Sequence, residues 1–115
     1  MIRLSERDTQ RQRAAKNQSL FREVNERIED LASNSAFSVF ICECMNELCD
    51  ENVPMTLEEY EDVRRGGNRF VVLPGHHVPE VEEVIDVIDG RYIIVAKLGA
   101  GAEVAEELDP RSRHA

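Results

Sequence analysis

The three cysteines of the chain, Cys42, Cys44 and Cys49, fall within eight residues of one another and are the residues best suited to chemistry. Three clustered sulfurs cannot all pair in disulfides, and deprotonated sulfur is a preferred ligand of Zn²⁺. A strand that continues through Cys44 would project Cys42 and Cys44 from one face, because side chains alternate along a strand. The next four residues can then return Cys49 to that face. The spacing predicts a metal site, although the Cys-x-Cys gap is shorter than in common zinc knuckles.

A fourth ligand is expected from the turn at residues 74–77, which contains His76 and His77. We favour His76 because Gly75 lets the backbone turn this side chain toward the metal, and His77 stays an alternative. Three thiolates and one imidazole make a closed tetrahedral site for structural Zn²⁺, whereas iron–sulfur clusters usually take four cysteines. A closed site has no open position for water. We therefore predict no catalytic residues and no enzyme activity.

Two other interpretations of the cysteines stay open, namely ordinary buried thiols and a thiol redox sensor. A redox-active cysteine needs a depressed pKa, which a nearby cation or helix N-terminus provides. The neighbours here are acidic and disfavour a thiolate: Glu43, Glu47, Asp50 and Glu51. The redox sensor is therefore kept as an alternative to structural zinc.

Residues 1–35 are expected to form a basic N-terminal helical arm. The stretch from Ser5 to Ala32 has no Pro or Gly and is rich in residues that favour a helix. Its apolar residues then recur with an a/d spacing over about two heptads: Phe21, Val24, Ile28 and Leu31. This apolar stripe would pack either on the chain's own domain or on a partner, which includes a second copy of the chain.

Residues 36–110 are expected to form a small α+β domain, and residues 111–115 a flexible tail. We predict strands at 37–42, 70–73, 81–88 and 91–97, and helices at 56–65 and 102–108. Thr56 and Glu59 form a capping box, and Asp89-Gly90 favours a type I′ hairpin turn. The predicted fold class is thus α+β, with a long N-terminal helix before a zinc-stapled unit of about four strands and one or two short helices.

The 115 residues carry 14 Lys and Arg against 23 Asp and Glu, a net charge of −9. Six bases and two acids lie in residues 1–22, so the remainder is strongly acidic. This balance disfavours nucleic acid as a ligand, and nucleic-acid binding through the basic arm is the weaker alternative. No apolar run is long enough for a membrane span, which favours a cytoplasmic protein with no membrane contact. Four acids are expected on a solvated strand face: Glu80, Glu82, Glu83 and Asp86.

These motifs together resemble a family of small, uncharacterised actinobacterial proteins over roughly residues 17–110. The resemblance rests on residues 40–44, Cys49, 53–61 and 69–76, which carry the Cys-x-Cys…Cys…Pro-Gly-His pattern and a Leu-x-x-Tyr helix. The family pattern has a single His directly after this Gly, so the resemblance implies that His76 is the ligand. It implies the order of elements and the ligand set, and no activity.

The sequence therefore predicts a non-enzymatic metal-binding module with an interaction or regulatory role. Structural Zn²⁺ would be held by Cys42, Cys44, Cys49 and His76. The module would bind a protein partner, or form a homodimer, through its N-terminal helix.

Overall fold

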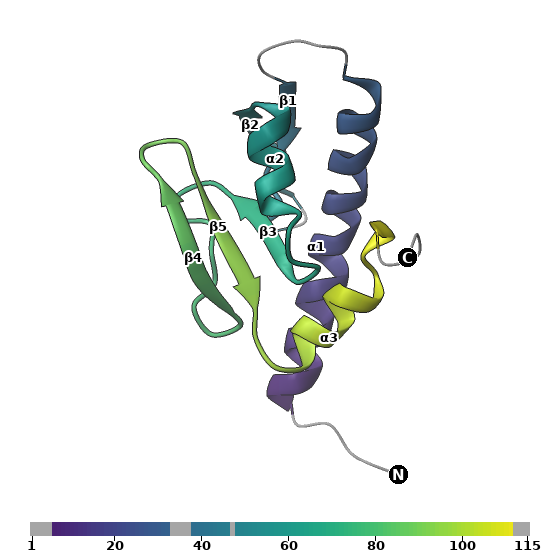
Figure 1. Cartoon of the computed structure of the whole chain (residues 1–115). Helices are drawn as coiled ribbons and strands as arrows, with labels where there is room; N and C mark the ends of the chain where they lie inside the picture. The colour runs from purple at the N-terminus through teal and green to yellow at the C-terminus, as the bar shows by residue number, and fades with distance from the viewer. Residues whose placement is uncertain (1–5, 33–37, 47, 112–115) are drawn as a thin grey trace.

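A computed structural model describes residues 6–32, 38–46 and 48–111, with the side chains of the first helix described from Ala15 onward. A long helix is followed by two small antiparallel sheets and two short helices (Figure 1). The predicted α+β fold class is confirmed. In chain order the elements are α1 (Glu6–Leu31), β1 (Ser38–Ile41), β2 (Asn52–Met55), α2 (Leu57–Val63), β3 (Arg69–Val72), β4 (Glu82–Ile88), β5 (Tyr92–Lys97) and α3 (Ala100–Glu107).

The smaller sheet pairs β1 with β2, a strand that the sequence analysis did not predict. The residues of β2 alternate in burial: Val53 and Met55 are buried, whereas Asn52 and Pro54 are exposed. Both strands of a two-stranded sheet are edge strands, so the missing N–H of Pro54 is tolerated. Strand β2 therefore forms although Pro54 made its sequence look unlike a strand.

The first strand spans Ser38–Ile41, so it ends one residue before the predicted end at Cys42 and does not continue through Cys44. The Cys42 N–H donates to the Glu51 carbonyl at 3.0 Å, but the Glu43 N–H donates to the Val71 carbonyl at 2.8 Å. The backbone thus changes partner from the β2 side to β3 within two residues. This short segment bridges the two sheets.

The larger sheet has the order β3-β5-β4, and the predicted hairpin of β4 and β5 is present. The predicted type I′ turn is wrong, because no described non-glycine residue has a positive φ and only Gly90 (φ 70°) supplies one here. Ile88 pairs with Tyr92, which leaves a three-residue loop. Arg91 in that loop donates to Glu59 at 2.7 Å and so ties the hairpin to α2.

The core lies between the sheets and α2, where the Phe40 and Tyr60 rings stack with centroids 4.4 Å apart. Apolar residues of β2, β3 and β5 complete it, including Val53, Phe70 and Val95, which are fully buried. Among the helices that the structure describes, none is long and apolar enough to cross a membrane.

Helix α1 packs against the rest of the molecule through its polar face. The fully buried Arg22 donates to the carbonyls of Gly67 and Ala105, both at 2.6 Å, and its guanidinium lies 4.6 Å from the centre of the Phe70 ring. Asn25 exchanges two hydrogen bonds with the backbone of Ile41, at 2.8 and 2.9 Å. Directional bonds to backbone groups therefore fix the position of this helix.

The predicted apolar stripe of α1 lies mostly on the outer side. Val24 and Leu31 are 46% and 85% exposed, and Leu20 beside them is 63% exposed. Phe21 is half-buried, and Ile28 packs against the edge of the core. The helix thus presents a largely uncovered apolar surface, which we call the outer stripe: Leu20, Phe21, Val24, Ile28 and Leu31.

Ion pairs join the C-terminal part of α1 to α2 and to the end of the described chain. Arg64 pairs with Glu26 and Asp109, and Arg111, the first residue of the expected tail, pairs with Glu26 at 2.8 Å. Residues 112–115 of that tail lie outside the described residues.

The expectation that Glu82 faces solvent was wrong. Glu82 is buried and pairs with the buried Lys97 at 3.0 Å, because a lysine inside the sheet requires an anionic partner.

The capping box of α2 gives a direct test of local stability. The Thr56 hydroxyl accepts from the Glu59 N–H at 3.0 Å, and the Glu59 carboxylate accepts from the Thr56 N–H at 2.9 Å. We expect Thr56→Ala to lower the free energy of unfolding by about 1 kcal/mol, as measured by urea denaturation. Thr56→Ser, which keeps the hydroxyl, is the matched control. Equal stability of the two variants would contradict the role of this cap.

Candidate metal centre

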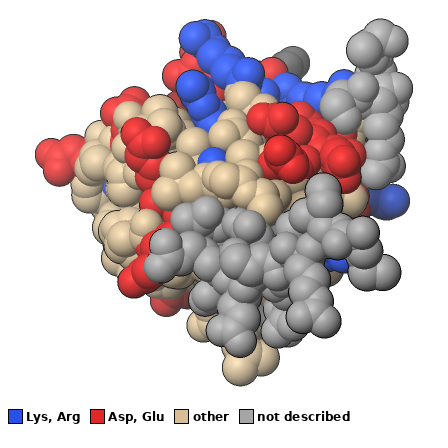
Figure 2. Space-filling view, turned by 90° about the horizontal axis from the view of Figure 1, so that it is seen from below, with Lys and Arg blue, Asp and Glu red and all other residues tan. Residues whose placement is uncertain are grey.

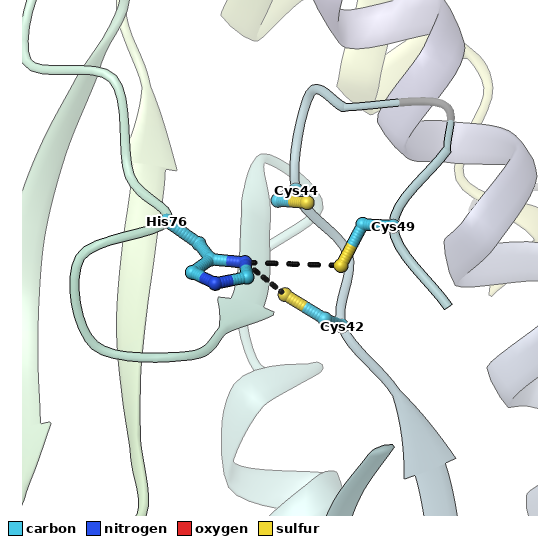
Figure 3. A group of neighbouring side chains, drawn as sticks. All are labelled: Cys42, Cys44, Cys49 and His76. Carbon is cyan, nitrogen blue, oxygen red and sulfur yellow. Dashed lines mark hydrogen bonds between the residues drawn. The ribbon is translucent and has the colours of Figure 1, made fainter. Parts of the chain in front are cut away.

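The four predicted ligands lie together at the junction of the two sheets (Figure 3). One ligand atom from each of the four residues lies within 4.8 Å of the others. His76 Nδ1 is 3.6 Å from Cys42 Sγ and 3.8 Å from Cys49 Sγ. A tetrahedral ion with metal–sulfur bonds of about 2.3 Å and a metal–nitrogen bond of about 2.0 Å would separate sulfur and nitrogen by about 3.5 Å. The group therefore has dimensions compatible with a metal site.

Two turns bring the more distant ligands to the cysteine pair. Cys49 follows a turn in which its N–H donates to the Asn46 carbonyl at 3.0 Å. His76 follows β3, where its N–H donates to the Leu73 carbonyl at 2.9 Å and Gly75 adopts a φ of +85°. This left-handed conformation disfavours other residues, so Gly75 permits the turn that aims His76 at the sulfurs.

Glu43, between Cys42 and Cys44, points away from them into the protein and is fully buried. Its carboxylate accepts from the Val71 N–H at 2.9 Å and from Asn25 at 2.8 Å. Burial raises the pKa of Glu43 to about 7, although both hydrogen bonds oppose the rise. With this side chain anchored inward, the flanking cysteines both lie on the other side of the segment.

The thiols of Cys42 and Cys44 are disfavoured as anions when no cation is present. Burial raises the pKa of both thiols, and the neighbouring Cys49 raises each further. The Leu73 N–H, which donates to Cys42 Sγ at 3.3 Å, is a partial compensation. A divalent metal would supply the missing positive charge and displace the protons. The electrostatics thus suit a metal ligand better than a free reactive thiolate.

The His76 ring is held from its opposite side. Its Nε2 lies 3.4 Å from a carboxylate oxygen of Glu51, while Nδ1 faces the sulfurs. A carboxylate on the second ring nitrogen is a common way to orient a metal-bound imidazole and to fix its tautomer. His77 is half-buried and does not belong to the four-residue group.

Sequence reasoning found the four residues of the group but missed two that position them, Glu43 and Glu51. Both were counted only as acidic neighbours of the cysteines. The position of Glu43 between two cysteines was a usable signal, because in an extended segment the residue between two side chains on one face points to the opposite face. Glu51 gave no such signal, since its contact depends on where His76 lies.

Comparison of the chain with protein-family models, curated proteins and solved structures finds no match. The resemblance to the actinobacterial family therefore stays a prediction. The chemistry of the site rests on its own geometry, which offers three sulfurs and one imidazole nitrogen to one ion.

Proposed function

We propose that this protein is a small, non-enzymatic interaction module whose fold is stabilised by structural Zn²⁺. The observation that carries the proposal is the convergence of Cys42, Cys44, Cys49 and His76, with their ligand atoms within 4.8 Å of one another. Zn²⁺ favours this mixture of thiolate and imidazole ligands in tetrahedral sites, and four protein ligands complete its coordination.

The position of the site explains why a metal would be structural. Cys42 and Cys44 extend from β1 of the smaller sheet, whereas His76 follows β3 of the larger one. A bound ion would therefore join two small sheets across their junction. Aromatic residues make up only 5% of the chain, so a metal cross-link would supplement a thin core. Reduced thiols are required, which suits the cytoplasm.

The interaction role is supported by the outer stripe of α1. A helix ordinarily buries its apolar face, but here Leu20, Val24 and Leu31 are exposed while Arg22 and Asn25 are buried. Contiguous exposed apolar surface is typical of protein–protein contacts. We propose that a protein partner or a second copy of the chain covers this stripe. Nucleic-acid binding through the arm has less support, because Arg22 is engaged inside the fold.

Elemental analysis of the purified chain, combined with light scattering, tests both parts of the proposal. We expect one zinc per chain, and a dimer mass would identify the second copy as the partner. Iron in place of zinc, or a folded protein with no metal, would overturn the zinc assignment. Mild peroxide separates the redox alternative: a structural site keeps its zinc, whereas a sensor releases it as the thiols oxidise.

A further inference from the structure

The outer edge of β4 is an open strand edge. In the sheet order β3-β5-β4 the two terminal strands are β3 and β4. The edge of β3 is covered by the cysteine segment, since Glu43 bonds to Val71 through both its N–H and its carboxylate. Within the described ranges no strand pairs with the other side of β4, which lies outermost in Figure 1. Unpaired backbone groups on such an edge can accept another strand.

The side chains along this edge are both apolar and acidic. Five consecutive residues, from Glu83 to Val87, are exposed, and three of them are large and apolar: Val84, Ile85 and Val87. The sequence from Phe70 to Gly90 contains no Lys or Arg but five acids. Figure 2 shows acidic side chains along the left of its view, the side on which the larger sheet lies, and further acidic side chains beside the basic ones at the top and right. The edge thus presents an apolar strand in a negative field.

We propose that β4 binds an extended, basic segment of a partner protein, which adds a strand to the larger sheet. The segment would alternate Lys or Arg with apolar residues. Its backbone would pair with the free edge, its cations would lie near Glu83 and Asp86, and its apolar residues would cover Val84 and Val87. Opposite charges across a strand pair stabilise it, whereas like charges destabilise it.

The same features disfavour a second copy of the chain on this edge. Pairing two β4 strands would bring two acidic edges together with no basic residue between them. The ladder between β4 and β5 is also interrupted by a register shift between Val84 and Asp86. Such bulges at an edge protect proteins from pairing with their own copies. The charge of the edge therefore selects a basic partner.

A synthetic peptide tests this proposal independently of the proposed metal site, because none of the four candidate ligands lies in β4. The probe is a fluorescent peptide of alternating Lys and Val, and the readout is fluorescence anisotropy with the metal-loaded protein. We expect it to bind at least about tenfold more tightly than a Glu-Val peptide of equal length. Proline at alternate positions of the probe should abolish binding, since proline cannot donate to a strand ladder. Equal binding of the proline peptide would overturn strand addition.

Charge reversal on the edge supplies the matched variant. Glu83→Lys with Asp86→Lys should reverse the preference, so that the Glu-Val peptide binds better, while the zinc content stays unchanged. Glu103→Lys with Glu107→Lys makes the same charge change on the exposed surface of α3. If that control weakens the Lys-Val peptide equally, the attraction is general and the proposal fails. Hydrogen exchange that slows in β4 with protein concentration alone would indicate a second copy instead and would also overturn it.

Discussion

Cys44→Ser is expected to abolish metal binding and cooperative folding. Structural zinc supplies apparent folding free energy on the order of 10 kcal/mol, and a domain of this size is stable by only about 5–15 kcal/mol in total. Serine has nearly the shape of cysteine, so the substitution opens little cavity at this buried position. A loss of stability in this variant would therefore reflect the missing bond between sulfur and metal. Zinc content and the thermal transition of the variant, followed by circular dichroism, measure the effect.

The paired histidines provide the control for this experiment. His76→Ala should lose the metal, whereas His77→Ala should keep it and unfold at nearly the temperature of the unmodified chain, because His76, unlike His77, belongs to the group of candidate ligands. Chelator should unfold the unmodified protein, and added Zn²⁺ should restore it. Full zinc retention in Cys44→Ser, or equal losses in the two histidine variants, would show that the four residues do not act as one site.

Arg22→Ala is expected to lower the free energy of unfolding by about 3–5 kcal/mol. The change removes both hydrogen-bond donors from the carbonyls of Gly67 and Ala105 and opens a cavity beside the Phe70 ring. Each buried carbonyl left unpaired costs about 1–3 kcal/mol. Urea denaturation of the zinc-loaded protein measures the difference.

Arg27→Ala is the matched control on the same helix. Arg27 is exposed, so its replacement should change stability by less than about 0.5 kcal/mol. Comparable losses in the two variants would mean that arginine substitutions act through helix propensity or net charge. The hydrogen bonds between α1 and the backbone would then contribute little.

Much of the fold was predictable because its signals are local. The capping box at Thr56, the hairpin at Asp89-Gly90 and the long first helix each depend on residues that are near in sequence, and the structure contains all three elements. The β2 strand was missed since its proline disfavours a strand in any context but an edge. The turn type was mistaken because a type I′ turn needs a positive φ at both central residues, whereas Gly90 has one and Asp89 does not.

The group of four candidate ligands was predictable for a different reason. Cysteine clusters are uncommon by chance, and a Gly-His turn after a strand offers a fourth ligand with few competitors. The two positioning carboxylates were less visible, because a glutamate in sequence does not reveal whether water or a buried amide will be its partner. Glu43 is anchored by Asn25 and Val71, which are 18 and 28 residues away.

The amino-acid sequence by itself determined the order of the helices and of every strand except β2, and it determined the four candidate ligands, since these follow from local propensity and residue chemistry. Only the tertiary structure decided which face of α1 turns inward. Periodicity favoured Val24 and Leu31 as buried residues, yet Arg22 and Asn25 occupy the interior. Their hydrogen bonds go to backbone carbonyls and amides of segments distant in the sequence. Every residue type has such backbone groups, so the pattern of side chains cannot predict which of them will be the partners.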